Sequence, residues 1–91
     1  MDWEVGLSNQ AERYLKQRHI PREDIIELVR KAIRKAFGES VALDFMALTG
    51  EWKGHYRVRT QKVRIIFSID LDHERVSVDV VDGRDRAYKK H

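Results

Sequence analysis

Apolar and polar residues alternate along three segments in the second half of the chain. The segments are 56–60, 63–69 and 76–80, and the polar stretches 61–62 and 71–74 separate them. Alternation at a period of two with short polar breaks is typical of an antiparallel meander that buries one face. The predicted buried face takes Tyr56, Val58, Val63, Ile65, Phe67, Ile69, Val76, Val78 and Val80. The predicted opposite face takes Arg57, Arg59, Arg64, Ile66, Ser68, Ser77 and Asp79.

The first half of the chain predicts one strand and two helices. Residues 2–7 alternate and indicate a strand, and Ser8 or Asn9 then offers an N-cap for a short helix. Pro21 suits the first position of a second helix, whose apolar residues recur at helical spacing. Gly38 is the expected C-terminal stop of that helix.

The segment 39–52 has no clear period, and we predict a loop at 42–46 that lays Leu43, Phe45 and Met46 onto the helices. Asp82 and Gly83 are predicted to break the last strand. The expected architecture is α+β, with an N-terminal strand, a two-helix hairpin and a three-stranded antiparallel meander. These elements would form a four-stranded sheet with the helices on one face.

Composition narrows the class of protein. The chain has 91 residues, which fits a single domain over residues 1–91 with one modest core. It has no cysteine, so it forms no disulfide, and this fits a reducing cytosol. It has neither an apolar run of membrane-spanning length nor a signal-peptide pattern. We therefore expect a soluble, cytoplasmic protein without a membrane partner.

The distribution of charge points to a polyanion as partner. Lys and Arg number 18 against 15 Asp and Glu, for a net charge of +3. Five arginines fall on the meander and the tail: Arg57, Arg59, Arg64, Arg84 and Arg86. An uneven basic surface of this kind favours nucleic acid. Alternatively, each arginine is solvated or pairs with an acidic residue of a neighbouring strand, here Asp79 or Glu74.

Three stretches of the sequence carry a resemblance to a known family. They are GHYRVR at 54–59, VRIIF at 63–67 and VDGRDRAY at 81–88. Together they resemble the RelE/ParE superfamily of bacterial toxins, and most closely its RelE branch. The order of predicted elements agrees over nearly the whole chain, whereas the degenerate motif covers about its last forty residues.

The resemblance implies an activity and a set of partners. Toxins of the RelE branch cut messenger RNA in the ribosomal A site without a metal, and a cognate antitoxin encoded beside them keeps them inactive. For this chain it therefore implies a metal-independent endoribonuclease without a cofactor. The implied partners are an antitoxin and the ribosome with its mRNA and rRNA.

The resemblance also implies roles for individual residues. The implied catalytic residues are Arg64, Arg84 and Tyr88. The implied RNA-binding residues are Arg57, Arg59, Arg86 and Lys89. These types suit attack of a 2′-hydroxyl on the adjacent phosphate, because arginine supplies permanently charged donors that match phosphate geometry.

The chain departs from the family pattern at Gly83, where many relatives carry a histidine before the tail arginine. Tyr88 is then the main candidate for proton transfer, and His55 is a weaker one. A tyrosine has an ordinary pKa of about 10, and nearby arginines favour the phenolate and lower that pKa. The alternative for Tyr88 is a tail aromatic packed on the rim of the sheet.

Two other functions stay open at this stage. A ParE-like protein would inhibit DNA gyrase and cut nothing, and a degenerate member would only bind RNA or an antitoxin. No metal site is predicted, because the histidines show no ligand spacing and 70–74 reads as a hairpin turn. Trp52 and Tyr56 are candidates for base stacking or for core and rim positions.

Overall fold

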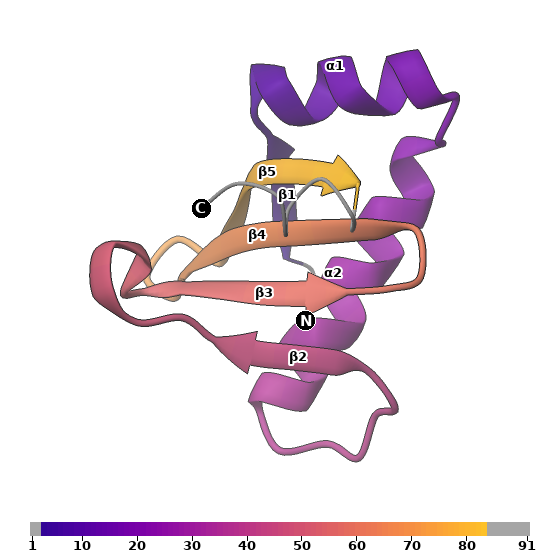
Figure 1. Cartoon of the computed structure of the whole chain (residues 1–91). Helices are drawn as coiled ribbons and strands as arrows, with labels where there is room; N and C mark the ends of the chain where they lie inside the picture. The colour runs from indigo at the N-terminus through magenta and orange to yellow at the C-terminus, as the bar shows by residue number, and fades with distance from the viewer. Residues whose placement is uncertain (1–2, 84–91) are drawn as a thin grey trace.

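The computed structural model describes residues 3–83, in which two helices cover one five-stranded sheet (Figure 1). The elements in chain order are β1 (Glu4–Leu7), α1 (Asn9–Arg18), α2 (Arg22–Ala36), β2 (Asp44–Ala47), a 3₁₀ turn η1 (Gly50–Trp52), β3 (His55–Arg59), β4 (Val63–Asp70) and β5 (Arg75–Gly83). The strand order in the sheet is β1-β5-β4-β3-β2. The α+β class and the antiparallel meander β3–β4–β5 are thus confirmed. In the described part of the chain no helix is long and apolar enough to span a membrane.

The helix ends follow local chemistry that the sequence carries. Ser8 is the N-cap of α1, and its Oγ accepts a hydrogen bond from the backbone N–H of Ala11 at 3.1 Å. Pro21 is the N-cap of α2, so the helix begins one residue later than predicted, at Arg22. After α2, Gly38 takes a φ of +96°, which a residue with a Cβ adopts only with strain.

The prediction of four strands is wrong, because the segment expected to be a loop contains β2. This strand pairs antiparallel with β3, with Phe45 opposite Val58 and Met46 opposite Arg57. Leu43 and Phe45 pack against the core as expected, whereas Met46 is 47% exposed and does not lie on the helices. Four residues are too few for the alternation to stand out from a loop.

β1 makes the sheet mixed, because it runs parallel to β5 along the opposite edge. It pairs from Glu4 opposite Arg75 to Leu7 opposite Val78. The chain therefore crosses from one edge strand to the other through the two helices, which lie behind the sheet and above it in Figure 1.

A β-bulge in β5 changes which of its residues face the core. Val78 lies opposite Phe67 and Val80 opposite Ile66, with the shift in register between them. Val81, rather than Val80, is therefore completely buried, so the prediction that placed Val80 in the core is wrong. The predicted break at Asp82 is also wrong, since β5 continues through Gly83.

The core lies between the helices and one face of the sheet, so the helices cover the face that the alternation predicted. Its completely or almost completely buried side chains include Ile25 and Val29 from α2, Leu15 from α1, and Val58, Ile65, Phe67, Val76, Val78 and Val81 from the strands. Burial of this apolar surface holds the sheet in a fixed register. Ile66 is also buried, at 6% exposure, but it is not part of this cluster.

Candidate nucleic-acid interface

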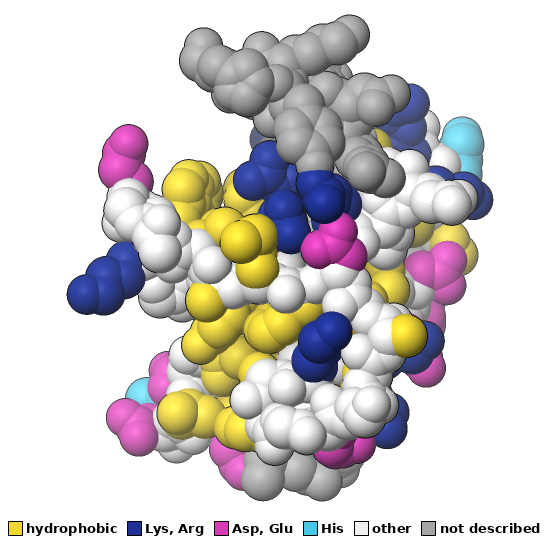
Figure 2. All heavy atoms as spheres, turned by 60° about the horizontal axis from the view of Figure 1, so that its bottom comes forward, with side chains coloured by type: hydrophobic (Ala, Val, Ile, Leu, Met, Phe, Trp, Pro, Cys, Tyr) yellow, Lys and Arg dark blue, Asp and Glu magenta, His cyan; other side chains and the backbone are white. Residues whose placement is uncertain are grey.

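Three of the predicted arginines lie together on the sheet face opposite the helices, called here the arginine face: Arg57, Arg59 and Arg64. Arg57 lies opposite Ile66, and Arg59 lies opposite Arg64, in the antiparallel pairing of β3 with β4. Residues directly opposite each other in a sheet share a face, as do residues two apart on one strand. The structure therefore brings Arg57, Arg59 and Arg64 together as the alternation predicted. In Figure 2 several Lys and Arg side chains gather beside an acidic side chain, with hydrophobic side chains below them.

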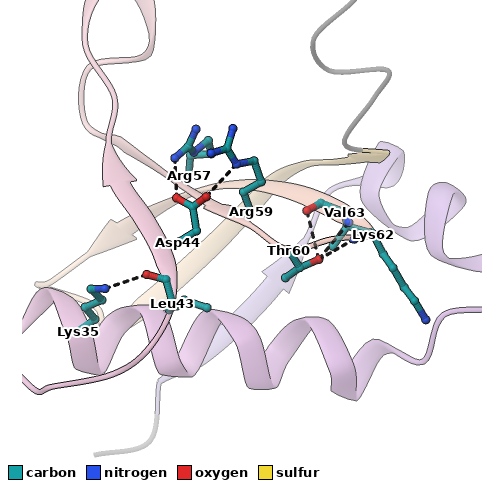
Figure 3. A network of polar contacts seen from close by, with 8 residues as sticks. All are labelled: Lys35, Leu43, Asp44, Arg57, Arg59, Thr60, Lys62 and Val63. Atoms are coloured by element: carbon teal, nitrogen blue, oxygen red, sulfur yellow. Dashed lines mark hydrogen bonds and ion pairs between the residues drawn. The ribbon is translucent and has the colours of Figure 1, made fainter.

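An aspartate that the sequence did not single out joins two of these arginines. Arg57 Nη2 donates to Asp44 Oδ1 at 2.9 Å, and Arg59 Nε donates to Asp44 Oδ2 at 2.8 Å (Figure 3). The side chains of Arg57 and Arg59 are only 13% and 23% exposed, so their guanidinium groups are held in place. Asp79 and Glu74, which the sequence suggested as partners of the arginines, do not join Arg57 to Arg59.

Two sets of hydrogen bonds fix the strands that carry Asp44 and the arginines. Lys35 Nζ donates to the carbonyl oxygen of Leu43 at 2.8 Å, which ties the start of β2 to α2 (Figure 3). In the β3–β4 turn, Thr60 Oγ1 accepts from the backbone N–H groups of Lys62 at 3.2 Å and Val63 at 3.1 Å. The predicted turn is confirmed, and it sets Arg59 and Arg64 opposite each other.

Arg64 differs from its two neighbours on the arginine face. Among residues 3–83, no ion pair involves Arg64. Its Nε is buried without a hydrogen-bond partner, as is the Nε of Arg57. It lies between Arg59 on β3 and Asp82 on β5 in the pairing of the strands. A permanently charged group with unused donors in such a place is suited to bind an anion.

His55 also lies on the arginine face, because it is two residues from Arg57 and opposite Ser68. Its Nε2 is 3.0 Å from Asp79 Oδ2 on β5, so the pair spans β4. The rings of Trp52 and His55 meet edge to face, with centroids 5.1 Å apart at 85°. No local pattern indicated the pairing of His55 with Asp79, because the two residues are distant in the chain.

The two aromatic candidates for base stacking, Trp52 and Tyr56, lie in different environments in the structure. Tyr56 packs on the helix side of the sheet, with ring centroids 5.5 Å from Phe45 and 5.8 Å from Phe67. It is therefore a core residue. Trp52 remains 42% exposed.

The turn between β4 and β5 forms as a hairpin turn, as expected. His73 Nδ1 lies 2.8 Å from Asp70 Oδ2, and this hydrogen bond holds the pKa of Asp70 below its usual range. Within residues 3–83, no three side chains of the metal-binding types come together to hold an ion.

Four of the predicted site residues, Arg84, Arg86, Tyr88 and Lys89, lie outside the described residues. Gly83 is the last described residue, and it is paired with Val63 at the end of β5. A Cβ at this position would lie 3.3 Å from the hydroxyl of Tyr14 on α1. A histidine at 83 would therefore need Tyr14 to shift, which fits the glycine found here.

The carboxylate of Asp44 is expected to compete with phosphate for Arg57 and Arg59. Asp44→Asn should therefore strengthen binding of a short single-stranded RNA by about fivefold, since ion pairs at a protein surface are worth up to about 1 kcal/mol. Fluorescence anisotropy at several salt concentrations measures this change. Asp72→Asn in the exposed β4–β5 turn removes the same charge and serves as control. Equal effects of the two substitutions would contradict a specific role for Asp44.

Comparison with solved structures identifies the fold. A chain of the toxin–antitoxin complex RelBE2 from Mycobacterium tuberculosis has a TM-score of 0.60 and 24% identity, over 92% of this chain and 100% of that one. A mutant of YafQ from E. coli has a TM-score of 0.63 and 13% identity, over 96% and 99%. A chain of the RelB–RelE antitoxin–toxin complex from Methanococcus jannaschii has a TM-score of 0.61 and 20% identity, over 92% and 95%. No protein-family profile and no curated protein matches the sequence.

These likenesses cover nearly the whole of each chain. The protein therefore has the fold of the RelE-type toxins, as the sequence resemblance implied. The fifth strand and the bulge are the points where the structure departs from the simpler sheet predicted from the sequence.

Proposed function

We propose that the protein is the toxin of a type II toxin–antitoxin system and cuts messenger RNA on the ribosome, in the bacterial cytoplasm. The observation that carries the proposal is the pairing of Arg59 with Arg64, with Arg57 beside them, on the sheet face opposite the helices of a RelE-type fold. A fold alone does not fix an activity, so the arginine face supplies the chemical argument.

In the proposed reaction a 2′-hydroxyl attacks the adjacent phosphate and expels the 5′-oxygen of the next nucleotide. Arg64, with donors unused among residues 3–83, would stabilise the charge that develops on the phosphate oxygens. Arg57 and Arg59 would bind phosphates of the same strand, and Arg86 and Lys89 of the tail would extend that contact. Arg84 would assist at the phosphate, and Tyr88 would transfer the proton. The proposed mechanism uses neither a metal nor a cofactor.

The proposed protein partner is an antitoxin that covers the arginine face. The chains that this fold resembles include members of the RelBE2 and RelB–RelE complexes. An extended acidic or amphipathic segment suits a cationic sheet and would become ordered as it binds. Its affinity should fall as salt rises, because salt screens the attraction between exposed charges.

Purified protein added to ribosomes that hold a defined codon in the A site tests the proposal. We expect cleavage within that codon, much slower cleavage of the same messenger without ribosomes, and no effect on supercoiling by gyrase. Inhibition of gyrase with intact messenger would overturn the nuclease and support the ParE-like alternative. An intact messenger with unaffected gyrase would overturn both activities and support the third alternative, a protein that only binds RNA or an antitoxin.

A further inference from the structure

Trp52 occupies a position that the proposed cleavage does not use. It ends the 3₁₀ turn η1, just before β3 begins at His55. Trp52 is 42% exposed, although tryptophan is usually highly buried. The edge-to-face contact with His55, at 5.1 Å between centroids, holds the ring against the end of the arginine face. The ring therefore has a neighbouring ring on one side and an exposed part on which another ring can stack.

His55 and Asp79 supply polar atoms beside this ring. Their side chains are 28% and 38% exposed, and Nε2 of His55 lies 3.0 Å from Oδ2 of Asp79. Nδ1 of His55 is buried without a hydrogen-bond partner in the described part of the chain. A buried polar atom without a partner is uncommon in folded proteins, and a bound water or another bound group is one explanation for it.

The charges at this end of the face favour a nucleobase over a phosphate. The carboxylate of Asp79 repels a phosphate but accepts hydrogen bonds from the amino groups of bases. An exposed indole stacks on any base, because every base has an aromatic face. The end of the arginine face that carries Trp52 and Asp79 therefore suits a base. At the other end, Arg59 and Arg64 lie opposite each other and attract anions.

The spacing along β3 places this site within reach of the same RNA strand. His55 is two residues from Arg57 and four from Arg59 on one strand. At about 3.3 Å per residue these separations are roughly 7 and 13 Å, the scale of one to two nucleotides of an extended strand. A strand whose phosphates lie on the arginines can therefore lay a neighbouring base on Trp52.

We propose that Trp52, His55 and Asp79 form a nucleobase-binding subsite of the arginine face. Trp52 stacks on one base of the bound strand, and the His55–Asp79 pair contacts the polar edge of that base. The subsite rests on the proposed function, since it takes a base of the RNA that the arginines bind. It would give the protein a base preference at one position of its substrate.

Binding of an RNA that cannot be cleaved tests the stacking. The probe is a six-nucleotide single strand with 2′-O-methyl sugars, compared with the same strand lacking its bases. The strand with bases should quench the fluorescence of Trp52, whereas Trp3, at 7% exposure, gives a constant background. Trp52→Ala should weaken binding of the strand with bases by about tenfold and leave the baseless strand unchanged.

Trp52→Phe is the matched control for the stacking. Phenylalanine keeps an aromatic ring, so most of the affinity should remain while the quenching is lost. Absence of quenching in the wild type, or an equal effect of Trp52→Ala on both strands, would overturn the subsite and leave the RNA-binding role intact. Failure of the wild type to bind either strand would overturn both.

His55→Phe separates the polar contact from the stacking. This variant keeps a ring beside Trp52 and removes both ring nitrogens. We expect the wild type to discriminate among strands of a single base type by several-fold, and the variant to lose that discrimination while retaining quenching. Unchanged discrimination in His55→Phe would show that the His55–Asp79 pair takes no part in the subsite.

Discussion

Arg64→Ala is expected to slow RNA cleavage on the ribosome by about 10²- to 10³-fold and to abolish growth arrest, because loss of one donor to the developing charge has an effect of this size. The fold should persist, since substitutions of partly exposed residues outside the core usually change the free energy of unfolding by less than about 0.5 kcal/mol. Single-turnover cleavage of an A-site codon measures the first effect, and urea unfolding measures the second. Arg84→Ala is expected to behave in the same way.

Arg75→Ala provides the matched control for Arg64→Ala. Arg75 is an arginine at the start of β5 whose Nη2 lies 2.8 Å from Glu4 Oε1, with a side chain that is 58% exposed. Its loss removes the same charge far along the sheet from Arg64 and should leave cleavage unchanged. A folded Arg64→Ala variant with full toxicity, or an equal loss in Arg75→Ala, would contradict the assignment of Arg64.

Tyr88→Phe is expected to slow single-turnover cleavage by about 10²- to 10⁴-fold, which is the usual contribution of a general acid or base. The reason is that Gly83 replaces the histidine of many relatives, which leaves Tyr88 as the main candidate for proton transfer within the tail motif. Binding to the ribosome should change little, because the phosphate contacts of the arginines dominate it.

Tyr88→Ala distinguishes proton transfer from base stacking by Tyr88. If Tyr88 transfers the proton, the Phe and Ala variants should both be slow. A Phe variant that cuts at the wild-type rate beside a slow Ala variant would make Tyr88 a stacking platform. His55 would then be the next candidate for proton transfer, to be tested with the same pair of substitutions, since the structure places it on the arginine face.

The sheet could be predicted where its alternation was long enough to read. β4 has eight residues and β5 nine, and the residues that they contribute to the core follow the period of two up to the bulge. β2 has four residues, and its last three are all apolar, so it showed no alternation that would mark a strand. The bulge between Val78 and Val80 could not be read from the pattern, because Val80 and Val81 are both apolar and either could face the core.

In the candidate site, too, the features that depend on local sequence could be predicted, whereas contacts between distant residues could not. The common face of Arg57, Arg59 and Arg64 follows from positions within two neighbouring strands. The role of Asp44 depends on the pairing of β2 with β3, which the sequence did not reveal. The contact of His55 with Asp79 likewise needs three strands in register, so no local pattern encodes it.

Mapping the 5′ ends of cellular messages after induction tests the central proposal most directly, when the ends are compared with the positions of translating ribosomes. A ribosome-dependent nuclease predicts new 5′ ends inside translated codons and in phase with the reading frame, and predicts that Arg64→Ala removes them. Intact messages accompanied by DNA damage would contradict the nuclease and identify the protein as an inhibitor of gyrase.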